Sequence, residues 1–244
     1  MKIIQLIILI ILPFWIISCS SREENQEIVV ATAADNPPYE FIHDGQIIGL
    51  DIDIINAIAE KLEKKIVIKN FDFNGLLAAL ASKNSDMIIA GLTVTEERKQ
   101  HVSFSIPYTE TNVSVLYRLA DQIKSIKDLE NKVIGVQLGT TWEIISKNFA
   151  KQFNIKINSL SNNLMLVEEL KTKAIDAVLL EELQAKQFIE NNHELASFSL
   201  TEFSSSLAIA MEKDSKLIMQ VNKAIRELEQ EGIISKIREK WLRQ

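Results

Sequence analysis

Short apolar runs of strand length alternate with segments of helical periodicity along most of this chain, and that alternation restricts the folds open to it. In the first third, the runs expected to be strands are residues 28–31, 66–68 and 87–90. Apolar side chains at helical spacing predict helices over residues 53–62 and about 75–82, the second with Asn74 as its N-cap. Buried strands that alternate with helices form mainly parallel sheets, so the sequence predicts an α/β fold.

The same alternation of expected strands and helices continues in the second half of the chain. Further strands are expected at residues 132–136, 155–157, 177–180 and 207–210, and helices at 141–149, 164–171, 181–189, 217–229 and 232–242. Ser125 and Asp128 have the spacing of a capping box at the start of a helical turn. Two similar halves with no loose linker between them predict two lobes packed face to face.

The N-terminal segment differs from the rest of the chain. An apolar run covers residues 3–17, shorter than the roughly 20 residues of a membrane-spanning helix but typical of a signal peptide. It ends at Ile16-Ile17-Ser18-Cys19, which resembles the lipobox of bacterial lipoproteins, where the cysteine carries the lipid. We therefore expect a signal peptide at residues 1–18 and a lipidated tether at residues 19–27. The alternatives are an uncleaved N-terminal anchor and a cleaved signal with an incidental cysteine.

The composition argues against several classes of function. The 244 residues include 33 acidic and 27 basic side chains, for a net charge of −6, without the basic cluster that nucleic-acid binding needs. Cys19 is the only cysteine, and His43, His101 and His193 are isolated from one another in the sequence. No metal-ligand spacing, nucleophile–base pair or phosphate-binding glycine loop is found. We expect no metal, no cofactor and no nucleic-acid partner.

Several motifs, in sequence order, resemble those of a known family. They lie at residues 49–53, 73–75, 90–99, 104–108, 135–141 and 176–179. Together they resemble the family 3 bacterial solute-binding proteins, the polar amino-acid receptors of ABC importers, over nearly the whole mature chain. The resemblance implies an α/β, two-lobed fold of the periplasmic-binding-protein type (type II), with a ligand cleft between the lobes and two crossover hinge strands. The implied lobe I is residues 28–108 and 207–244, lobe II is 113–202, and the hinges are 109–112 and 203–206.

A free amino acid presents a carboxylate that needs a charged or multiply hydrogen-bonded partner once it leaves water. The resemblance assigns this carboxylate to Arg98, because a planar guanidinium can bind such a group through two parallel hydrogen bonds. Thr93 would add a hydroxyl and a backbone N–H. Thr141, from the other lobe, would open a helix whose N-terminus attracts an anion.

The ammonium of the ligand needs acceptors. Glu181 falls where the family usually has an aspartate and would pair with the ammonium, helped by the carbonyl of Gly91; the neighbouring Glu182 is a rival. Phe73 matches a position that stacks along the ligand side chain, and Trp142 either contacts the ligand or packs in the core. Each of these residues also has a structural interpretation, as a solvated charge, a helix cap or a core aromatic.

Departures from the family pattern leave the identity of the bound amino acid undetermined. Ala33 replaces a polar residue that in relatives often contacts the ligand side chain, and Asn36 replaces an aromatic residue that stacks on it. Gln137 replaces a lysine of the glutamine-binding member, and Leu180 its histidine. Asp35 could attract a cationic side chain or form an Asx turn before the two prolines. With Asp35 and Gln137 in the ligand-binding set, we expect a polar amino acid that is glutamine-like or basic.

The resemblance implies the substrate-binding component of an amino-acid ABC importer, which delivers its ligand to a membrane permease with its ATPase. The protein would be an exported monomer in the periplasm or at the cell surface, held to the membrane by a lipid on Cys19. The alternative is a periplasmic, dehydratase-like enzyme of the same fold acting on a small amino or carboxylic acid; a sensor domain is a further alternative. Turnover of the ligand would distinguish the enzyme from a receptor.

Overall fold

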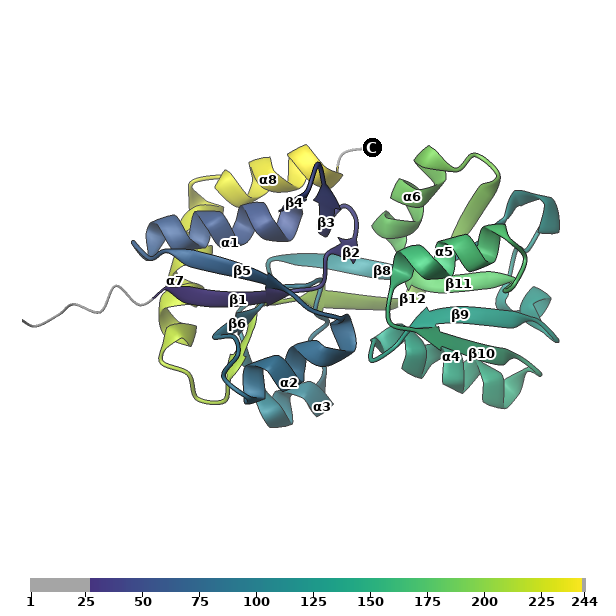
Figure 1. Cartoon of the computed structure of the whole chain (residues 1–244), viewed down its shortest axis with the longest axis horizontal. Helices are drawn as coiled ribbons and strands as arrows, with labels where there is room; N and C mark the ends of the chain where they lie inside the picture. Colours follow the sequence, from purple (N-terminus) through teal and green to yellow (C-terminus); the bar gives the residue numbers. More distant parts are fainter. Residues whose placement is uncertain (1–26, 243–244) are drawn as a thin grey trace, which may run out of the picture.

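Two α/β lobes lie side by side and are joined by two long strands (Figure 1). The computed structural model describes residues 27–242, so the expected signal peptide and Cys19 lie outside the described residues, as does all but the last residue of the expected tether. No helix within the described residues is long and apolar enough to cross a membrane.

Lobe I is built on a five-stranded sheet with the order β5-β1-β6-β13-β7. Its strands are β1 (Ile28–Thr32), β5 (Ile66–Asn70), β6 (Met87–Ile88), β7 (Val102–Phe104) and β13 (Ala210–Glu212). A smaller sheet, β2-β3-β4, lies at its edge toward lobe II: β2 (Asp35–Asn36), β3 (Glu40–His43) and β4 (Gln46–Ile48). The small sheet is the part of lobe I from which several site residues project.

Helices cover both faces of the lobe I sheet, so its central strands β1 and β6 are largely buried. One face carries α1 (Leu50–Lys61), α7 (Leu217–Gln230) and α8 (Ile233–Leu242), whose apolar residues share one core with β1 and β6. The opposite face carries α2 (Leu76–Ala81), which follows a 3₁₀ turn at Phe73–Gly75, and the short α3 (Glu96–His101).

Lobe II repeats the plan with a sheet of order β10-β9-β11-β8-β12. Its elements are β8 (Thr109–Arg118), β9 (Val133–Gln137), α4 (Thr141–Gln152), β10 (Lys156–Leu160), α5 (Asn163–Lys171), β11 (Ala177–Glu181), α6 (Glu182–Asn191) and β12 (Leu195–Leu207). Side chains alternate across a strand. Leu179 accordingly packs with α4, while Val178 and Leu180 pack with α5 and α6.

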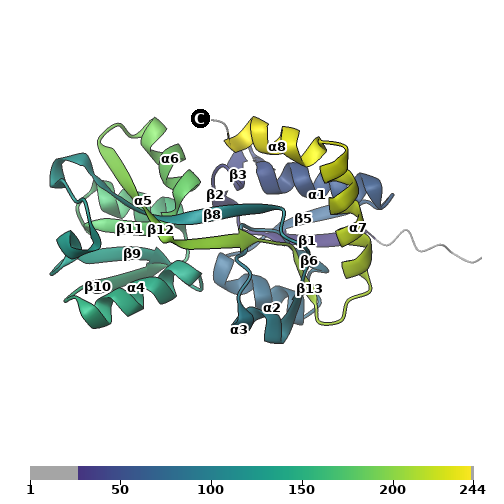
Figure 2. The same cartoon turned by 180° about the vertical axis from the view of Figure 1, so that it is seen from behind.

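The two strands that join the lobes, β8 and β12, pair with each other along most of their length (Figure 2). Residues 109–112 pair with residues 204–207 between the lobes, and the register shifts between Leu200 and Ser204. This irregularity lies where the paired strands leave lobe II, which is a place where a sheet bends readily.

Three expectations about local structure were wrong. Each large sheet combines parallel and antiparallel pairs, because the strands that return from the other lobe run against their neighbours. Asn74 does not cap a helix; it lies inside the 3₁₀ turn that Asp72 precedes. The expected strand 207–210 is divided, with Leu207 ending β12 and Ala210 beginning β13. The capping box of Ser125 and Asp128 is confirmed.

Candidate functional site

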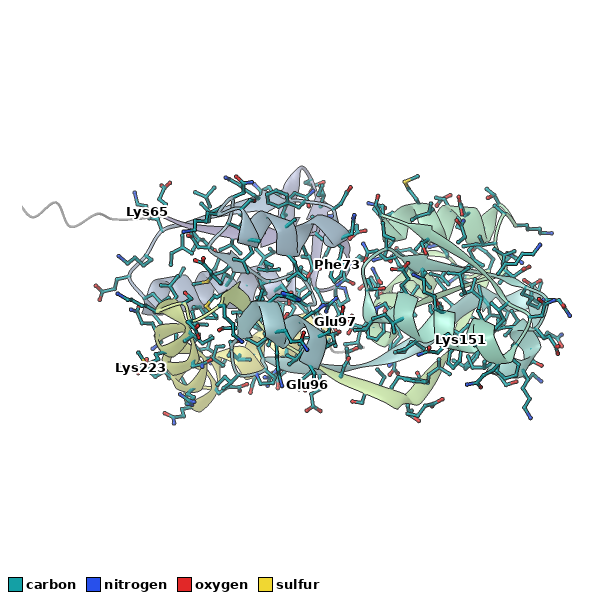
Figure 3. The ribbon with its side chains drawn as sticks, turned by 90° about the horizontal axis from the view of Figure 1, so that it is seen from below. Lys65, Phe73, Glu96, Glu97, Lys151 and Lys223 are labelled. Atoms are coloured by element: carbon teal, nitrogen blue, oxygen red, sulfur yellow. The ribbon has the colours of Figure 1, made fainter. Side chains whose placement is uncertain are left out.

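Arg98 lies where the two lobes meet. Thr95 caps α3 and accepts a hydrogen bond from the backbone N–H of Arg98 at 3.1 Å, which fixes the start of that helix. The guanidinium donates through Nη1 to the carbonyl oxygen of Thr93 at 2.8 Å and through Nη2 to that of Gly139, in lobe II, at 3.0 Å. Its Cζ lies 5.7 Å from the centre of the Phe73 ring, which faces lobe II (Figure 3).

Arg98 is only 9% exposed, and burial lowers its pKa to about 10. The side chain nevertheless stays charged near neutral pH, because that value is far above 7. Within residues 27–242 the guanidinium donates to carbonyl oxygens, and the only negative charge acting on it is that of the exposed Glu97, so a carboxylate placed beside it would gain a strong ion pair.

Lobe II presents the start of α4 to this guanidinium. Gly139 adopts φ +81°, and the Cβ of any other residue would lie 3.1 Å from the Cβ of Asn74 in the opposite lobe. Thr140 caps α4 by accepting from the N–H of Glu143 at 3.2 Å. The helix begins at Thr141, so its first backbone N–H groups have no partner within the helix and carry the positive end of its dipole.

Residues of both lobes enclose a narrow cavity between Arg98 and Glu181. Its lining is Asn36, Phe73, Ala90, Gly91, Thr93, Arg98, Gln137, Thr140, Thr141, Trp142 and Glu181. About 20 Å³ of it is open to the centre of a water-sized sphere, which is room for roughly one water molecule. An amino acid is far larger, so the lobes must part to admit one.

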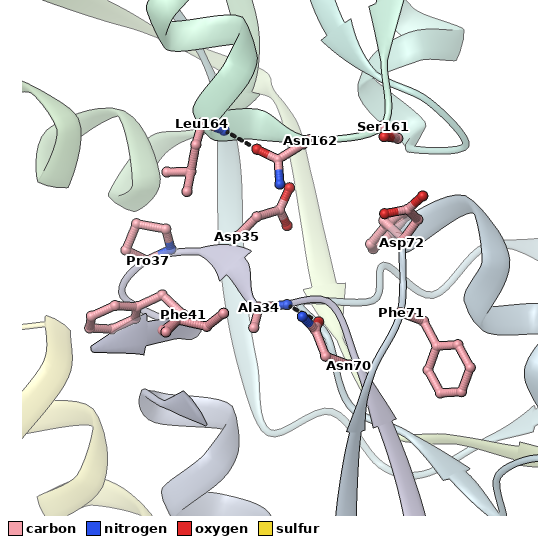
Figure 4. A pocket seen from close by; sticks show the side chains of 12 residues that line it. Ala34, Asp35, Pro37, Phe41, Asn70, Phe71, Asp72, Ser161, Asn162 and Leu164 are labelled. Carbon is pink, nitrogen blue, oxygen red and sulfur yellow. Dashed lines mark hydrogen bonds between the residues drawn. The ribbon is translucent and has the colours of Figure 1, made fainter. Parts of the chain in front are cut away.

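The sequence-based set of ligand-binding residues lines this cavity with one exception. Phe73, Gly91, Thr93 and Arg98 of lobe I and Gln137, Thr141 and Glu181 of lobe II belong to the lining. Asp35 does not; it lines a neighbouring cavity of about 350 Å³ (Figure 4). Trp142 is 8% exposed and contributes both to the lining and to the lobe II core, so the two interpretations of this residue are compatible.

Glu181 ends β11 rather than beginning α6, and its carboxylate is buried between the lobes. It is 4% exposed, and Tyr39 of lobe I donates its hydroxyl to Oε1. Burial raises the pKa of Glu181 to about 8. The rival Glu182 lies outside the lining and instead pairs with Lys186 at 3.0 Å and accepts from Asn112 Nδ2 at 3.0 Å.

Sequence reasoning missed two carboxyl groups beneath the cavity, Glu40 and Asp51, which have no exposed surface. Asp51 Oδ2 accepts from the N–H of Gly91 and from the hydroxyl of Tyr108, each at 2.8 Å. Burial raises the pKa of Asp51 to about 6 and that of Glu40 well above its usual range, and the negative charge of Asp51 raises the pKa of Glu40 further. Adjacent buried carboxyl groups of this kind share one proton at neutral pH.

Glu40 also orients Asn36, which lines the cavity. The Nδ2 group of Asn36 donates to Glu40 Oε1 at 3.0 Å, so the amide oxygen points away from Glu40. That oxygen is buried and has no donor within residues 27–242. Asn36 lines the cavity with its Nδ2 toward Gly91, 2.7 Å from where a Cβ at Gly91 would lie, and its buried Oδ1 is an acceptor that a ligand group carrying N–H could use.

A signal for both missed residues exists in the sequence. Glu40 interrupts an otherwise apolar and aromatic stretch between Tyr39 and Phe41, and Asp51 follows directly after the glycine and leucine of a family motif. Acidic side chains in such positions are rarely buried without a reason. Within the described chain, no group of histidine, cysteine and acidic side chains could hold a metal ion.

The chain is similar to known amino-acid-binding proteins in both sequence and fold. The sequence profile of the bacterial extracellular solute-binding proteins, family 3, matches residues 28–244. The arginine-binding extracellular protein ArtP of Bacillus subtilis is 32% identical over 248 aligned residues, which cover 98% of this chain and 97% of that protein. A probable histidine-binding protein of Campylobacter jejuni is 34% identical over 229 residues, covering 91% and 88%. The structure of an ancestral arginine-binding protein bound to arginine has a TM-score of 0.84 and 38% identity, covering 88% of this chain and 97% of that one.

Proposed function

Because this chain belongs to the bacterial extracellular solute-binding proteins, family 3, we propose that it captures a free amino acid between its lobes and presents it to a membrane importer. The family and the two-lobed fold expected from the motifs are both confirmed by the comparisons. The importer partner would be an ABC permease with its ATPase. We further propose export to the periplasm or cell surface as a monomer, with a lipid anchor on Cys19.

The single observation that carries the proposal is the cavity that pairs a buried cation with a buried carboxylate. In the proposed complex, Arg98 and Thr93 bind the ligand carboxylate from lobe I, and the start of α4 at Thr141 binds it from lobe II. Glu181 and the carbonyl of Gly91 accept from the ammonium. Binding one ligand to both lobes makes closure depend on the ligand, since each lobe then contributes part of the binding energy.

The class of side chain that we propose is basic. Asn36 lines the cavity and has a buried amide oxygen without a donor in residues 27–242, and Glu40 and Asp51 lie behind it with one shared proton. A cationic side chain that reached Asn36 would donate to this oxygen and displace the proton from Glu40. A neutral amino acid adds one ammonium and one carboxylate, whose charges cancel, so only a basic one brings net positive charge to the buried acidic groups Glu40, Asp51 and Glu181.

A thermal-shift screen of residues 20–244 against the twenty amino acids and ornithine tests the function. A ligand that binds only the native state raises the melting temperature, by an amount that grows with concentration over Kd. Arginine, lysine, histidine or ornithine should give the largest shifts. Folded, ligand-free protein that responds to none of the amino acids would contradict the proposal, and chemical conversion of a bound ligand would favour the enzyme instead.

Glu40→Gln tests the basic class. The variant keeps the hydrogen bond to Asn36 but cannot become negatively charged, so it should bind arginine at least tenfold more weakly while changing glutamine binding much less. The free energy of unfolding should change little, because burial raises the pKa of Glu40 well above its usual range and glutamine replaces a group that is already uncharged without a ligand. Equal changes for arginine and glutamine, measured by calorimetry, would exclude Glu40 from selectivity.

A further inference from the structure

Asp35 makes more contacts across the lobes than its expected role in ligand binding explains. It lies on β2 of lobe I and is 6% exposed. Its Oδ2 accepts from Gln137 Nε2 at 2.8 Å and from the backbone N–H of Asn163 at 2.7 Å, and its carbonyl oxygen accepts from Gln184 Nε2 at 3.1 Å. These three donors come from β9, α5 and α6, so one residue of lobe I contacts three elements of lobe II.

The first turn of α5 has a backbone N–H that the helix itself leaves without an acceptor, and this carboxylate accepts from it. Asn162 caps the helix by accepting from the N–H groups of Leu164 and Met165, at 2.9 and 3.2 Å. The N–H of Asn163 is left for an acceptor from outside, and an anion there is stabilised by the helix dipole. Figure 4 shows the carboxylate of Asp35 pointing from lobe I toward the Asn162 segment of lobe II.

The side chain of Gln137 is held in the donating orientation by lobe II itself. Its Oε1 accepts from Asn163 Nδ2 at 2.9 Å, and its Nε2 also donates to the carbonyl oxygen of Ser161 at 3.1 Å. The N–H that meets Asp35 is therefore already oriented before the lobes come together. Preorganised donors lose little side-chain freedom when an acceptor arrives.

We propose that Asp35 is a positioning residue that latches the closed lobes together and does not read the ligand side chain. This inference rests on the proposed function, since closure is what traps the amino acid. It also gives a role to Gln137, whose lining atoms face the ligand cavity while its amide holds the latch. Asp35 then affects every ligand in the same way, because it acts on closure.

Desolvation of the Asp35 carboxylate partly opposes closure, so the latch is reversible. One oxygen of Asp35, Oδ1, is buried and has no donor among the described residues, so closure removes part of its hydration without replacing it. Burial accordingly raises the pKa of Asp35 to about 6, with the nearby Asp72 adding to the effect. A latch that is partly opposed by desolvation holds the lobes without preventing release.

Asp35→Ala tests the proposal, with binding of L-arginine and L-lysine followed by calorimetry and stopped flow. Hydrogen bonds to a buried charge are worth about tenfold to a hundredfold in affinity. The variant should bind both amino acids more weakly by the same factor in this range, chiefly through faster dissociation. Gln184→Ala, which removes one donor away from the ligand cavity, should give a smaller change of the same kind.

Asp72→Ala is the matched control, because Asp72 is an exposed carboxylate on the rim of the same cavity. Asp35→Asn, which keeps an acceptor oxygen, should recover most of the loss seen with alanine. Unequal losses for arginine and lysine would place Asp35 on the ligand and overturn the latch, as would unchanged dissociation rates in both variants. A wild-type protein that binds neither amino acid would overturn the basic class alone, and the same comparison of Asp35→Ala with the wild type, made with the amino acid found by the thermal-shift screen, would then decide the latch.

Discussion

Arg98→Ala removes the buried cation to which the ligand carboxylate is assigned. The guanidinium is 9% exposed and rests 5.7 Å above the Phe73 ring, so water has little access to replace it. Removing one partner of a buried, hydrogen-bonded charge pair costs about 2–5 kcal/mol, or roughly thirtyfold to several thousandfold in Kd. The low exposure places the expected loss in the upper part of that range, above about a hundredfold. Arg98→Lys keeps the charge but not the planar fork, so its loss should be intermediate.

Isothermal titration calorimetry with the amino acid found by the screen measures both variants. Arg226→Ala is the matched control, because Arg226 is an exposed arginine on α7 of the same lobe. Circular dichroism and a melting curve without ligand establish that each variant is folded. A Kd for Arg98→Ala within about threefold of the wild-type value would refute the assignment of the carboxylate site, whatever the control does.

Two further predictions concern titration and folding. Burial raises the pKa of Glu181 to about 8, and only its ionised form pairs with an ammonium, so affinity should rise by up to about tenfold per pH unit from pH 6 to 8 and then level off. Glu181→Gln should flatten this profile. A flat wild-type profile in calorimetry across that range would contradict the pairing. Gly49→Ala should destabilise the protein by at least about 2 kcal/mol in urea unfolding, because φ is +136° and a Cβ would lie 2.1 Å from the carbonyl oxygen of Tyr39. Gly45→Ala, at φ +75° with open space around it, should cost clearly less, and equal losses would disprove the steric argument.

Most helices and strands could be predicted from the sequence because their signals are local. The helices α1, α4, α5 and α7 each begin and end within a few residues of the periodic segments that predicted them. The two crossover strands, β8 and β12, were expected only from the family resemblance, and their pairing was not predicted, because both strands depend on partners far along the chain. The antiparallel half of each sheet was missed for the same reason: strand direction is decided by the path of the chain between the lobes.

The candidate site was foreseen where a motif carried it and missed where burial alone decided it. Arg98, Thr93 and Glu181 were expected to converge, and the structure brings them to one cavity. Glu40 and Asp51 were missed although Glu40 interrupts an apolar stretch and Asp51 lies in a family motif, because an acidic side chain in a short strand or a first helical turn is ordinarily solvated. Their pKa values are raised only because the fold removes water from both.

The sequence by itself determined most of the helices and the central strands of both sheets, and its motifs indicated the family and the arginine at the cleft, since periodicity, capping and motifs act over a few residues at a time. Only the tertiary structure decided what Asp35 does. Its two side-chain partners lie 102 and 128 residues away, on a strand and a helix of the other lobe. Hydrogen bonds depend on distance and direction in space, and no local pattern records which distant donors the fold will bring to a given carboxylate.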